Sequence, residues 1–591
     1  MAKGGLFKLI NGYESRSITG KSFASFSYSG EVTRRRQRIK NMRFFGFING
    51  VARGISATSC QVYGSAALTY GVLTVLVHFL KDYFTPDVRL PLASLIVGIA
   101  FSILAIPLLL ADKPIADLLR DVSVIDYILY EFFCIRRTYT DGGERTIPFA
   151  PAILFSALLG LLGYFVPAWV VAAALGAFLF LYGAILSPEF AFFSSLLVLP
   201  YLNFLPEAEL IFSAIVLISG ASFFRKATSG KRVIFLEQYD LLLGMMLLFV
   251  TASGIFMKGI ESFTSALLML AMSVGYFLAS NIVTNRRLAD CTLNAMVFSS
   301  ILPVLVAIGQ FTYFATSRGL VETLKRGVSS TFASPDVFSV FLVVALICTA
   351  ALARQHNKTH KLFYVLVLVM QLAALAMTGE VIAVFAIILS AVAYRLVKRR
   401  AAAVLLFPIL FLIPYSVLFL PESVRSVILD YGDIEALWRT AATALCENPI
   451  LGIGIGDGSF ATEMAERGIF WVSDAHNLFL GFGVTAGAIA FALLVLLIFV
   501  RLRHRLVYRA YVKHSQVGRI APMMSAAVFA LLCLGTTEYI WADFSMFYLF
   551  WCVFGLGSAT LRVAKKEHDD RVLYFEDTRR TYSSALNVHV R

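Results

Sequence analysis

One histidine and its neighbours form a pattern suited to proton-transfer chemistry. His476 lies in the stretch SDAHNLFL, residues 473–480, where a polar loop runs into an apolar segment. An imidazole in the first turn of a helix meets the positive end of the helix dipole, which favours the neutral, proton-accepting form. The adjacent Asn477 offers amide groups to a hydroxyl-bearing ligand. We therefore predict His476 as a general base and Asn477 as a ligand contact in a reaction on a hydroxyl group.

A structural interpretation of the same stretch stays open. Ser473 or Asp474 is able to cap the following helix, so that the ring lies in the membrane interface. The preceding residues 447–460, ENPILGIGIGDGSF, carry glycine at every second position from 452 to 458. They never complete GxGxxG, and no strand–helix unit surrounds them, which argues against a dinucleotide site. They predict a tightly bent re-entry loop, whose bare amides are also able to contact an anionic or sugar ligand.

The elements that position these residues are membrane helices. Hydrophobic residues make up 59% of the 591-residue chain and charged residues only 15%. Apolar runs of about 18–22 residues recur from 55 to 561, each long enough to cross a bilayer. The runs are continuous and do not alternate at period two, which excludes a barrel. We predict an all-α polytopic membrane protein with about 14–16 transmembrane helices.

The positions of the basic residues indicate the membrane topology of the chain. The net charge of +14 comes largely from Lys/Arg clusters between apolar runs, such as RRRQRIK at 34–40 and RLVKRR at 395–400. This is the pattern of cytoplasmic loops, and it argues against nucleic-acid binding. Both termini are then cytoplasmic. The seven scattered cysteines contain no CxxC pair and predict neither a disulfide framework nor a metal site.

The predicted organisation has five parts. They are a basic cytoplasmic tail at 1–54, transmembrane helices 1–13 at 55–420, an extracytoplasmic loop at 421–475, transmembrane helices 14–16 at 476–561, and a cytoplasmic tail at 562–591. Residues 1–54 lack a cleavable signal pattern, so the first span acts as an uncleaved anchor.

Two of the predicted outer loops are longer than a simple turn. The loop 421–475 has nine acids and three arginines, and its stretch DIEALWRTAATALCEN predicts an amphipathic interfacial helix that stops at Pro449. The loop 314–335 carries three cations, Arg318, Lys325 and Arg326. By the same topology these cations and His476 lie on the outer side.

An ordered set of short motifs resembles the O-antigen ligase and polymerase family of bacterial membranes. The likeness covers roughly residues 240–500. It consists of Gln310 near the end of an apolar span, KRGVSSTFASPDVFSVFLVVAL at 325–346, Asn448-Pro449, Gly452-Ile453-Gly454, Phe460, His476-Asn477 and the small-residue segment GFGVTAGAIAFALL.

This resemblance implies a GT-C-type glycosyltransferase of the bacterial cytoplasmic membrane. Such an enzyme transfers a glycan from an undecaprenyl-diphosphate donor, among membrane lipids on the outer face, to a glycan, lipid or protein acceptor. It implies no metal or other cofactor. A diphosphate leaving group needs fixed cations because negative charge develops on it. We assign this role first to Arg326, together with Lys325 and Arg318, and secondly to Arg439, and we expect His476 and Arg326 to share one outer cavity.

The chain also departs from the family pattern. Thr378-Gly379-Glu380-Val381 stands where the family commonly has Ser-Arg-Gly, and Asp336 stands where asparagine is usual. Arg326 is also suited to bind lipid headgroups. Arg439 has the spacing of an ordinary helix salt bridge with Glu435.

Other functions therefore stay open. They are a lipid-linked oligosaccharide flippase or other polytopic transporter, and a glycan-binding or scaffolding relative without catalysis. A transporter predicts charged or broken helices near the bilayer midplane, whereas the polar residues here collect in outer loops. Within the enzyme class, the sequence leaves polymerase and ligase undecided.

Overall fold

A computed structural model of the chain describes most of the apolar segments. The described residues are 16–17, 54–84, 92–135, 147–205, 207–228, 232, 234–257, 259–355, 358–397, 406, 408–409, 412, 434–456, 458–507, 515 and 517–588. The tail 1–54 and the predicted span 403–420 lie almost entirely outside them, as do residues 421–433 of the long loop.

The chain is a helical, multi-pass membrane protein. Nine helices among the described residues are long and apolar enough to cross a membrane, and five shorter apolar helices accompany them. The one pair of strands in the described ranges, β1 (Arg16–Ser17) and β2 (Phe235–Leu236), is two residues long. The predicted all-α membrane class is thus confirmed.

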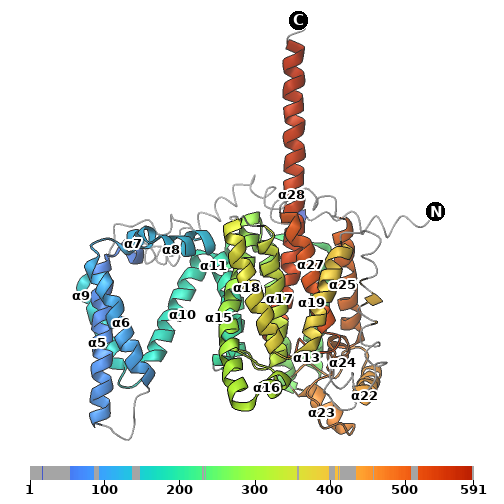
Figure 1. Cartoon of the computed structure of the whole chain (residues 1–591), viewed down its shortest axis with the longest axis horizontal. Coiled ribbons are helices and arrows are strands. Elements are labelled where there is room, and N and C mark those ends of the chain that lie inside the picture. The colour runs from blue at the N-terminus through green and yellow to red at the C-terminus, as the bar shows by residue number, and fades with distance from the viewer. Residues whose placement is uncertain are drawn as a thin grey trace, which may run out of the picture. The chain divides into compact units, whose positions relative to one another are not determined.

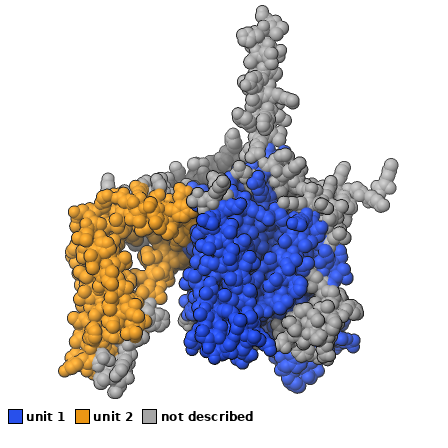
Figure 2. Space-filling view, viewed as in Figure 1, with its two compact units in different colours: residues 1–21, 192–223, 233–591 blue, residues 22–191, 224–232 orange. Residues whose placement is uncertain are grey.

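The chain forms two compact units, shown in blue and orange in Figure 2. Unit 1 comprises residues 1–21, 192–223 and 233–591, and unit 2 comprises residues 22–191 and 224–232. The helices of unit 2 are α5 (Cys60–Phe84), α6 (Leu92–Leu110), α7 (Ile115–Asp121), α8 (Ser123–Asp126), the π-helix η1 (Tyr127–Phe132), α9 (Phe149–Leu162) and α10 (Ala168–Leu186). Two helices run from one unit into the other, α11 (Pro188–Val198) and α12 (Ala208–Thr228).

Unit 1 contains the candidate site. Its first half has the 3₁₀ helix η3 (Leu199–Phe204), α13 (Gln238–Phe256), α14 (Gly259–Ile282), α15 (Arg286–Arg318), α16 (Leu320–Arg326), α17 (Pro335–Ala353), α18 (Lys358–Met377) and α19 (Val381–Val397). Its second half has α22 (Ile434–Glu447), α23 (Ser459–Glu466), α24 (Leu478–Ala486), α25 (Ala488–Val507), the 3₁₀ helix η5 (Val517–Arg519), α27 (Ile520–Leu534) and α28 (Phe544–Val588). Figure 1 shows α15, α17, α18 and α19 as neighbouring, steeply inclined helices.

Several predicted elements differ in their bounds. Within the predicted transmembrane region 476–561, the first apolar segment, 476–500, was expected as one span but is divided into α24 and α25 at Gly487, which has φ +92°. The segment 189–205 is α11 followed by η3, with Pro200 in the 3₁₀ turn. The amphipathic helix of the long loop is present as α22, with Ile434, Leu437, Ala441 and Ala444 buried along one face.

Charged residues are also buried inside unit 1, which the sequence analysis did not predict. Arg562 of α28 pairs with Glu237 at 3.1 Å and donates to the carbonyl of Ser280, while Tyr276 donates to Asp240. Arg501 of α25 is buried above the ring of Phe554. Arg562 lies about 27 Å along α28 from its first residue, so this network is remote from the cavity described below.

Candidate functional site

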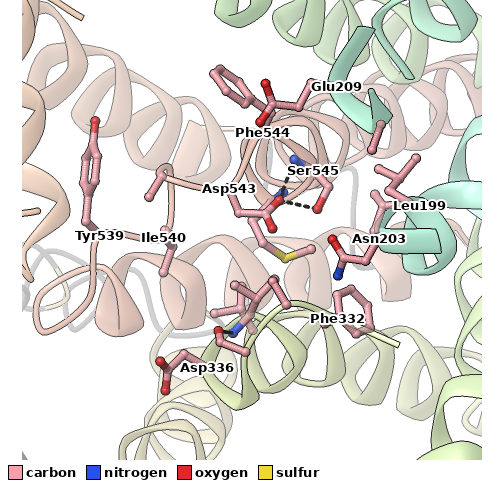
Figure 3. Close-up of a pocket in the computed structure, with 18 of the residues that line it drawn as sticks. Leu199, Asn203, Glu209, Phe332, Asp336, Tyr539, Ile540, Asp543, Phe544 and Ser545 are labelled. Carbon is pink, nitrogen blue, oxygen red and sulfur yellow. Dashed lines mark hydrogen bonds between the residues drawn. The ribbon is translucent and has the colours of Figure 1, made fainter. Parts of the chain in front are cut away.

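A cavity of about 450 Å³ opens at one end of unit 1. Figure 3 shows 18 of the residues that line it and labels ten of them. Its walls come from η3, the starts of α12, α17 and α28, α14, and the loops around Asp474 and Glu538. The predicted outer loops 314–335 and 421–475 therefore both contribute to this end, through Phe332, Ala333, Ser334 and Asp474. The lining mixes aromatic rings such as Phe332 and Phe544 with five carboxylates: Glu209, Asp336, Asp474, Glu538 and Asp543.

Three helices begin at this cavity, and each has an acid at its start. Asp543 precedes α28 and accepts hydrogen bonds from the backbone N–H groups of Ser545, at 2.7 Å, and Met546, at 3.2 Å. Glu209 and Asp336 lie in the first turns of α12 and α17. The protein's own carboxylates thus occupy the positive helix ends that would otherwise attract an anion.

The strap between α16 and α17 is fixed by two amides. Gln310 of α15 donates to the Ser330 carbonyl at 3.0 Å and accepts from the Ser330 N–H at 2.9 Å. Asn203 of η3, which lines the cavity, donates to the carbonyl of Thr331 at 3.1 Å. These bonds hold Phe332 and Asp336 in the cavity wall.

The long loop folds as a small apolar body that carries His476. Its core contains Leu437, Ala441 and Ala444 of α22, Phe460 and Met464 of α23, and Ile453, Val472, Ala475 and Val484. Trp438 donates from its indole nitrogen to the carbonyl of Ala475 at 3.0 Å, directly before the histidine. Phe460 is one of the residues on which the family resemblance rests. Its buried ring packs in the core of this loop.

The glycine ladder packs against the break between α24 and α25. Gly452 has φ +68°, and a side chain there would clash with the carbonyl oxygen of Val484. Ile453 donates to the Val484 carbonyl at 2.9 Å, and Gly454 to the Thr485 carbonyl at 3.2 Å. These contacts agree with the tightly bent loop predicted for these glycines, and the backbone that they approach is the chain next to Gly487.

His476 is held between two carboxylates. Its backbone N–H donates to Asp474 at 2.8 Å, and the residue has φ +44°, a conformation that non-glycine residues seldom adopt. The imidazole Nδ1 lies 3.5 Å from Asp474 and 3.7 Å from Glu538, and only 13% of the side chain is exposed. Both carboxylates line the cavity, so the imidazole lies directly behind its wall.

The charge around His476 overturns one prediction. Burial alone lowers the pKa of the imidazole, but Glu538, Asp474 and Asp336 act in the opposite direction, and the net pKa is raised. The expected stabilisation of the neutral ring by a helix dipole is therefore wrong in sign. The ring precedes α24 and three carboxylates outweigh the dipole.

Asn477, and neither Ser473 nor Asp474, caps α24. Its side-chain oxygen accepts from the N–H groups of Phe479 at 2.9 Å and Leu480 at 3.0 Å, and its amide nitrogen donates to the Thr536 carbonyl at 3.0 Å. The side chain is buried and does not line the cavity. The Asn477 amide thus has a structural role, because it caps α24 and bonds to Thr536. This role was not part of the prediction, which assigned Asn477 only to ligand binding.

The four predicted phosphate-binding cations lie outside the cavity lining. Arg326 pairs with Glu322 at 2.8 Å, and Arg439 with Glu435 at 2.5 Å; both pairs are solvent-exposed and join successive helix turns. The exposed Lys325 precedes Arg326, and Arg318 lies over the ring of Phe314. Neither Arg326 nor His476 is among the residues that line this cavity, so the expectation that the two share it is not met.

Two glycines nevertheless place the basic end of α16 beside the cavity wall. Gly327, with φ +67°, ends α16, and a side chain there would clash with the carbonyl of Thr378. Gly379, with φ +76°, is packed equally tightly against the carbonyl of Leu324. The cations of α16 thus lie next to the turn that carries Glu380.

Comparison with known proteins does not assign the chain to a family. The chain matches no family model, and no curated protein is similar to it in sequence.

The described residues contain no group of three or more His, Cys, Asp and Glu side chains arranged to hold a metal ion.

The sequence analysis missed most of the acidic residues of the cavity. Glu538 and Asp543 lie in TTEYIWADFS, residues 536–545, between two apolar helices. Both acids lie inside the region 476–561 predicted as transmembrane, which was a usable signal, because ionisable residues within membrane segments are seldom without a role.

Together these residues form an imidazole backed by carboxylates next to a cavity of polar and aromatic side chains. Carboxylates accept hydrogen bonds from hydroxyl groups, and the imidazole accepts a proton. The arrangement is suited to binding and activating a hydroxyl-bearing molecule.

Proposed function

We propose that this protein is a bacterial membrane glycosyltransferase of the O-antigen ligase and polymerase type. It transfers glycan from an undecaprenyl-diphosphate donor at the outer face of the cytoplasmic membrane, with both termini in the cytoplasm. The observation that carries the proposal is the His476 imidazole, placed between Asp474 and Glu538 behind the wall of the cavity.

In the proposed reaction the acceptor hydroxyl enters the cavity and passes its proton, through one bridging water, to His476 behind the cavity wall. The hydroxyl oxygen forms a bond to the anomeric carbon of the donor as the bond from that carbon to the diphosphate breaks. The electron pair leaves with the diphosphate. The carboxylates that raise the pKa of His476 make it a stronger base and stabilise the imidazolium that forms.

Donor and acceptor occupy different places in this scheme. Five carboxylates repel a diphosphate from the cavity itself, so the diphosphate lies at the cavity mouth. There we assign Arg326 and Lys325, with Arg318, to the leaving group. The contact between Gly327 and Thr378 keeps this basic helix end beside the wall.

Replacement of the histidine tests the proposal. Membranes that contain His476→Ala should accumulate the lipid-linked glycan and form no transfer product, while the protein remains inserted. His360→Ala, which changes an imidazole in α18 away from the cavity lining, is the matched control and should retain activity. Accumulation of single repeat units identifies a polymerase, and accumulation of full-length chains a ligase. Normal product from His476→Ala would refute the proposal.

A flippase for lipid-linked oligosaccharides is the second candidate. The buried network of Glu237, Arg501 and Arg562 is a feature that transporters share, since they also bury paired charges, and here it lies toward the end of the α28 span that is remote from the cavity. Reconstituted vesicles distinguish the two functions. A flippase moves labelled lipid-linked sugar between leaflets without forming a glycosidic bond, whereas the proposed enzyme forms the bond.

A further inference from the structure

Three large apolar side chains of the body that carries His476 face outwards. Phe470 is 81% exposed and Trp471 48%, in the loop between α23 and α24, and Ile450 is 60% exposed in the turn after α22. We call Ile450, Phe470 and Trp471 the apolar tip. Single exposed apolar residues are ordinary on a protein surface, whereas a contiguous group of them marks an interaction site.

The residues of the apolar tip lie in neighbouring parts of the body. Helices α22, α23 and α24 pack together at one end of unit 1 (Figure 1). Arg467, directly after α23, pairs at 2.5 Å with Glu447, the last residue of α22. Ile450 follows Glu447 by three positions, and Phe470 follows Arg467 by three. The ion pair therefore joins the two segments that carry the tip.

The apolar face of α22 is not available to a partner. Leu437 and Ala441 on this face pack into the core of the body, although the sequence predicted α22 as an interfacial helix. The exposed side of α22 carries the ion pair of Glu435 and Arg439 instead. A contact between the body and an apolar partner is therefore better made by the apolar tip than by α22.

The apolar tip adjoins a surface that faces lipid. The N–H of Ala488, the first residue of α25, donates to the Pro449 carbonyl at 2.8 Å, and a side chain at Gly487 would clash with the Ile450 carbonyl. Helix α25 is apolar and packs on α13. It exposes Ile489, Leu496 and Phe499. Because exposed apolar side chains of a membrane helix contact lipid, the tip begins where this lipid contact ends.

The chemistry of the apolar tip favours lipid over sugar. The side chains of Ile450 and Phe470 have no polar atom that could bond to a sugar hydroxyl. Trp471 combines a large apolar ring with one N–H group, a combination that is enriched where a membrane meets water. We propose that the apolar tip inserts into the bilayer interface and holds the body that carries His476 against the membrane.

The apolar tip is rigidly coupled to the histidine. Trp471 precedes His476 by five residues, which span at most about 17 Å. Between them Val472 and Ala475 are buried in the core of the body, and the Ala475 carbonyl accepts from Trp438. Insertion of the tip thus fixes the imidazole near the level of the lipid headgroups, where a lipid-linked diphosphate lies. This effect on catalysis rests on the proposed function, whereas the insertion does not.

Quenching of tryptophan emission by brominated lipids tests the insertion. The full chain is placed in phosphatidylcholine nanodiscs without substrate, and the emission lost in Trp471→Phe gives the contribution of Trp471. Lipids brominated near the headgroup should quench this contribution more strongly than lipids brominated near the chain ends. Trp438→Phe is the matched control, because the Trp438 ring packs against the core of the body and its contribution should be quenched little.

A Trp471 contribution that lipid bromine does not quench would overturn the proposal. The same holds if a soluble oligosaccharide, and not the lipid, changes this emission, since the tip would then be a surface for glycan.

Phe470→Glu tests what the insertion does for the enzyme. A carboxylate is costly among lipid tails, so quenching at Trp471 should fall by about twofold or more. With the body less well positioned, kcat/KM for glycan transfer should fall by about tenfold, while the exposed position keeps the unfolding midpoint close to native. Ala442→Glu, which puts the same charge on the exposed side of α22, is the control and should change neither.

Unchanged transfer by Phe470→Glu, despite reduced quenching, would overturn the role of the tip in positioning His476. If lipid quenches Trp471 but the native chain transfers no glycan, the proposed function fails and the insertion stands.

Discussion

Replacing Glu538 by glutamine removes one of the two carboxylates that flank the His476 imidazole. The substitution keeps the shape of the side chain and its ability to accept a hydrogen bond, but it takes away the negative charge 3.7 Å from Nδ1. Because this charge favours the imidazolium form, its loss should lower the pKa of His476.

The distance sets the size of the effect. Opposite unit charges about 4 Å apart attract by roughly 4 kcal/mol at an effective dielectric constant of about 20, equivalent to about three pKa units. Water in the open cavity screens part of this attraction, and Asp474 remains 3.5 Å from the same nitrogen. We therefore expect the pKa of His476 to fall by about one unit in Glu538→Gln.

The pH dependence of kcat/KM for glycan transfer measures this shift, because it reports the ionisation of the free enzyme. The acid limb of the profile should move down by about one unit, and the plateau should fall by at most about tenfold, since a less basic imidazole is a weaker base. Glu447→Gln serves as control because Glu447 pairs with Arg467 and does not contact the imidazole. Its acid limb should match that of the native chain.

Thermal unfolding checks the same coupling without activity. A raised pKa of His476 stabilises the folded state below the unfolded pKa near 6.5, and this stabilisation is lost as the pH rises through the folded pKa. Glu538→Gln should therefore lower the unfolding midpoint more at pH 6 than at pH 9. An unchanged acid limb together with a pH-independent loss of stability would show that Glu538 does not act on the imidazole, and our reasoning would be refuted.

Three further substitutions probe the parts of the site. Gly379→Ala should cost about 2–5 kcal/mol of stability, since it combines backbone strain with a clash against α16. Gly319→Ala, at φ +89° and ψ 154° with open space around it, adds strain without a clash and should cost only about 1–3 kcal/mol in the same unfolding assay. Asn477→Ala removes the cap of α24 and leaves the Thr536 carbonyl without its amide donor, so the unfolding midpoint should fall by the equivalent of about 2–4 kcal/mol. Arg326→Gln should raise KM for the lipid-linked donor several-fold and leave the midpoint almost unchanged, because exposed pairs within a helix contribute only about 0.5 kcal/mol; an unchanged KM would exclude Arg326 from donor binding.

The sequence was sufficient to predict features that depend on local composition. The apolar runs predicted membrane helices, and the spacing of Leu437 and Ala441 predicted the buried face of α22. The division of the apolar segment 476–500 at Gly487 was not predictable from hydropathy, because α24 and α25 are both apolar and hydropathy carries no information about φ.

The environment of His476 depends on residues far apart in the chain. Asp474 is a near neighbour, but Asp336 precedes the histidine by 140 positions and Glu538 follows it by 62. Reasoning about a single helix end therefore gave the wrong direction for the pKa of the imidazole. It could not include carboxylates that only the tertiary fold brings together.

The position of the cations outside the cavity has a physical advantage for a transfer reaction. If Arg326 lay among the carboxylates, each charge would neutralise the other, the imidazole would lose basicity and the diphosphate would lose its attraction. The backbone contact between Gly327 and Thr378 gives proximity without such neutralisation, since the exposed cations of α16 adjoin the wall without entering it. The base requires negative surroundings and the leaving group requires positive surroundings, so the two are stabilised best on separate but adjacent surfaces. Unit 1 has an acidic and a basic surface of this kind at one end.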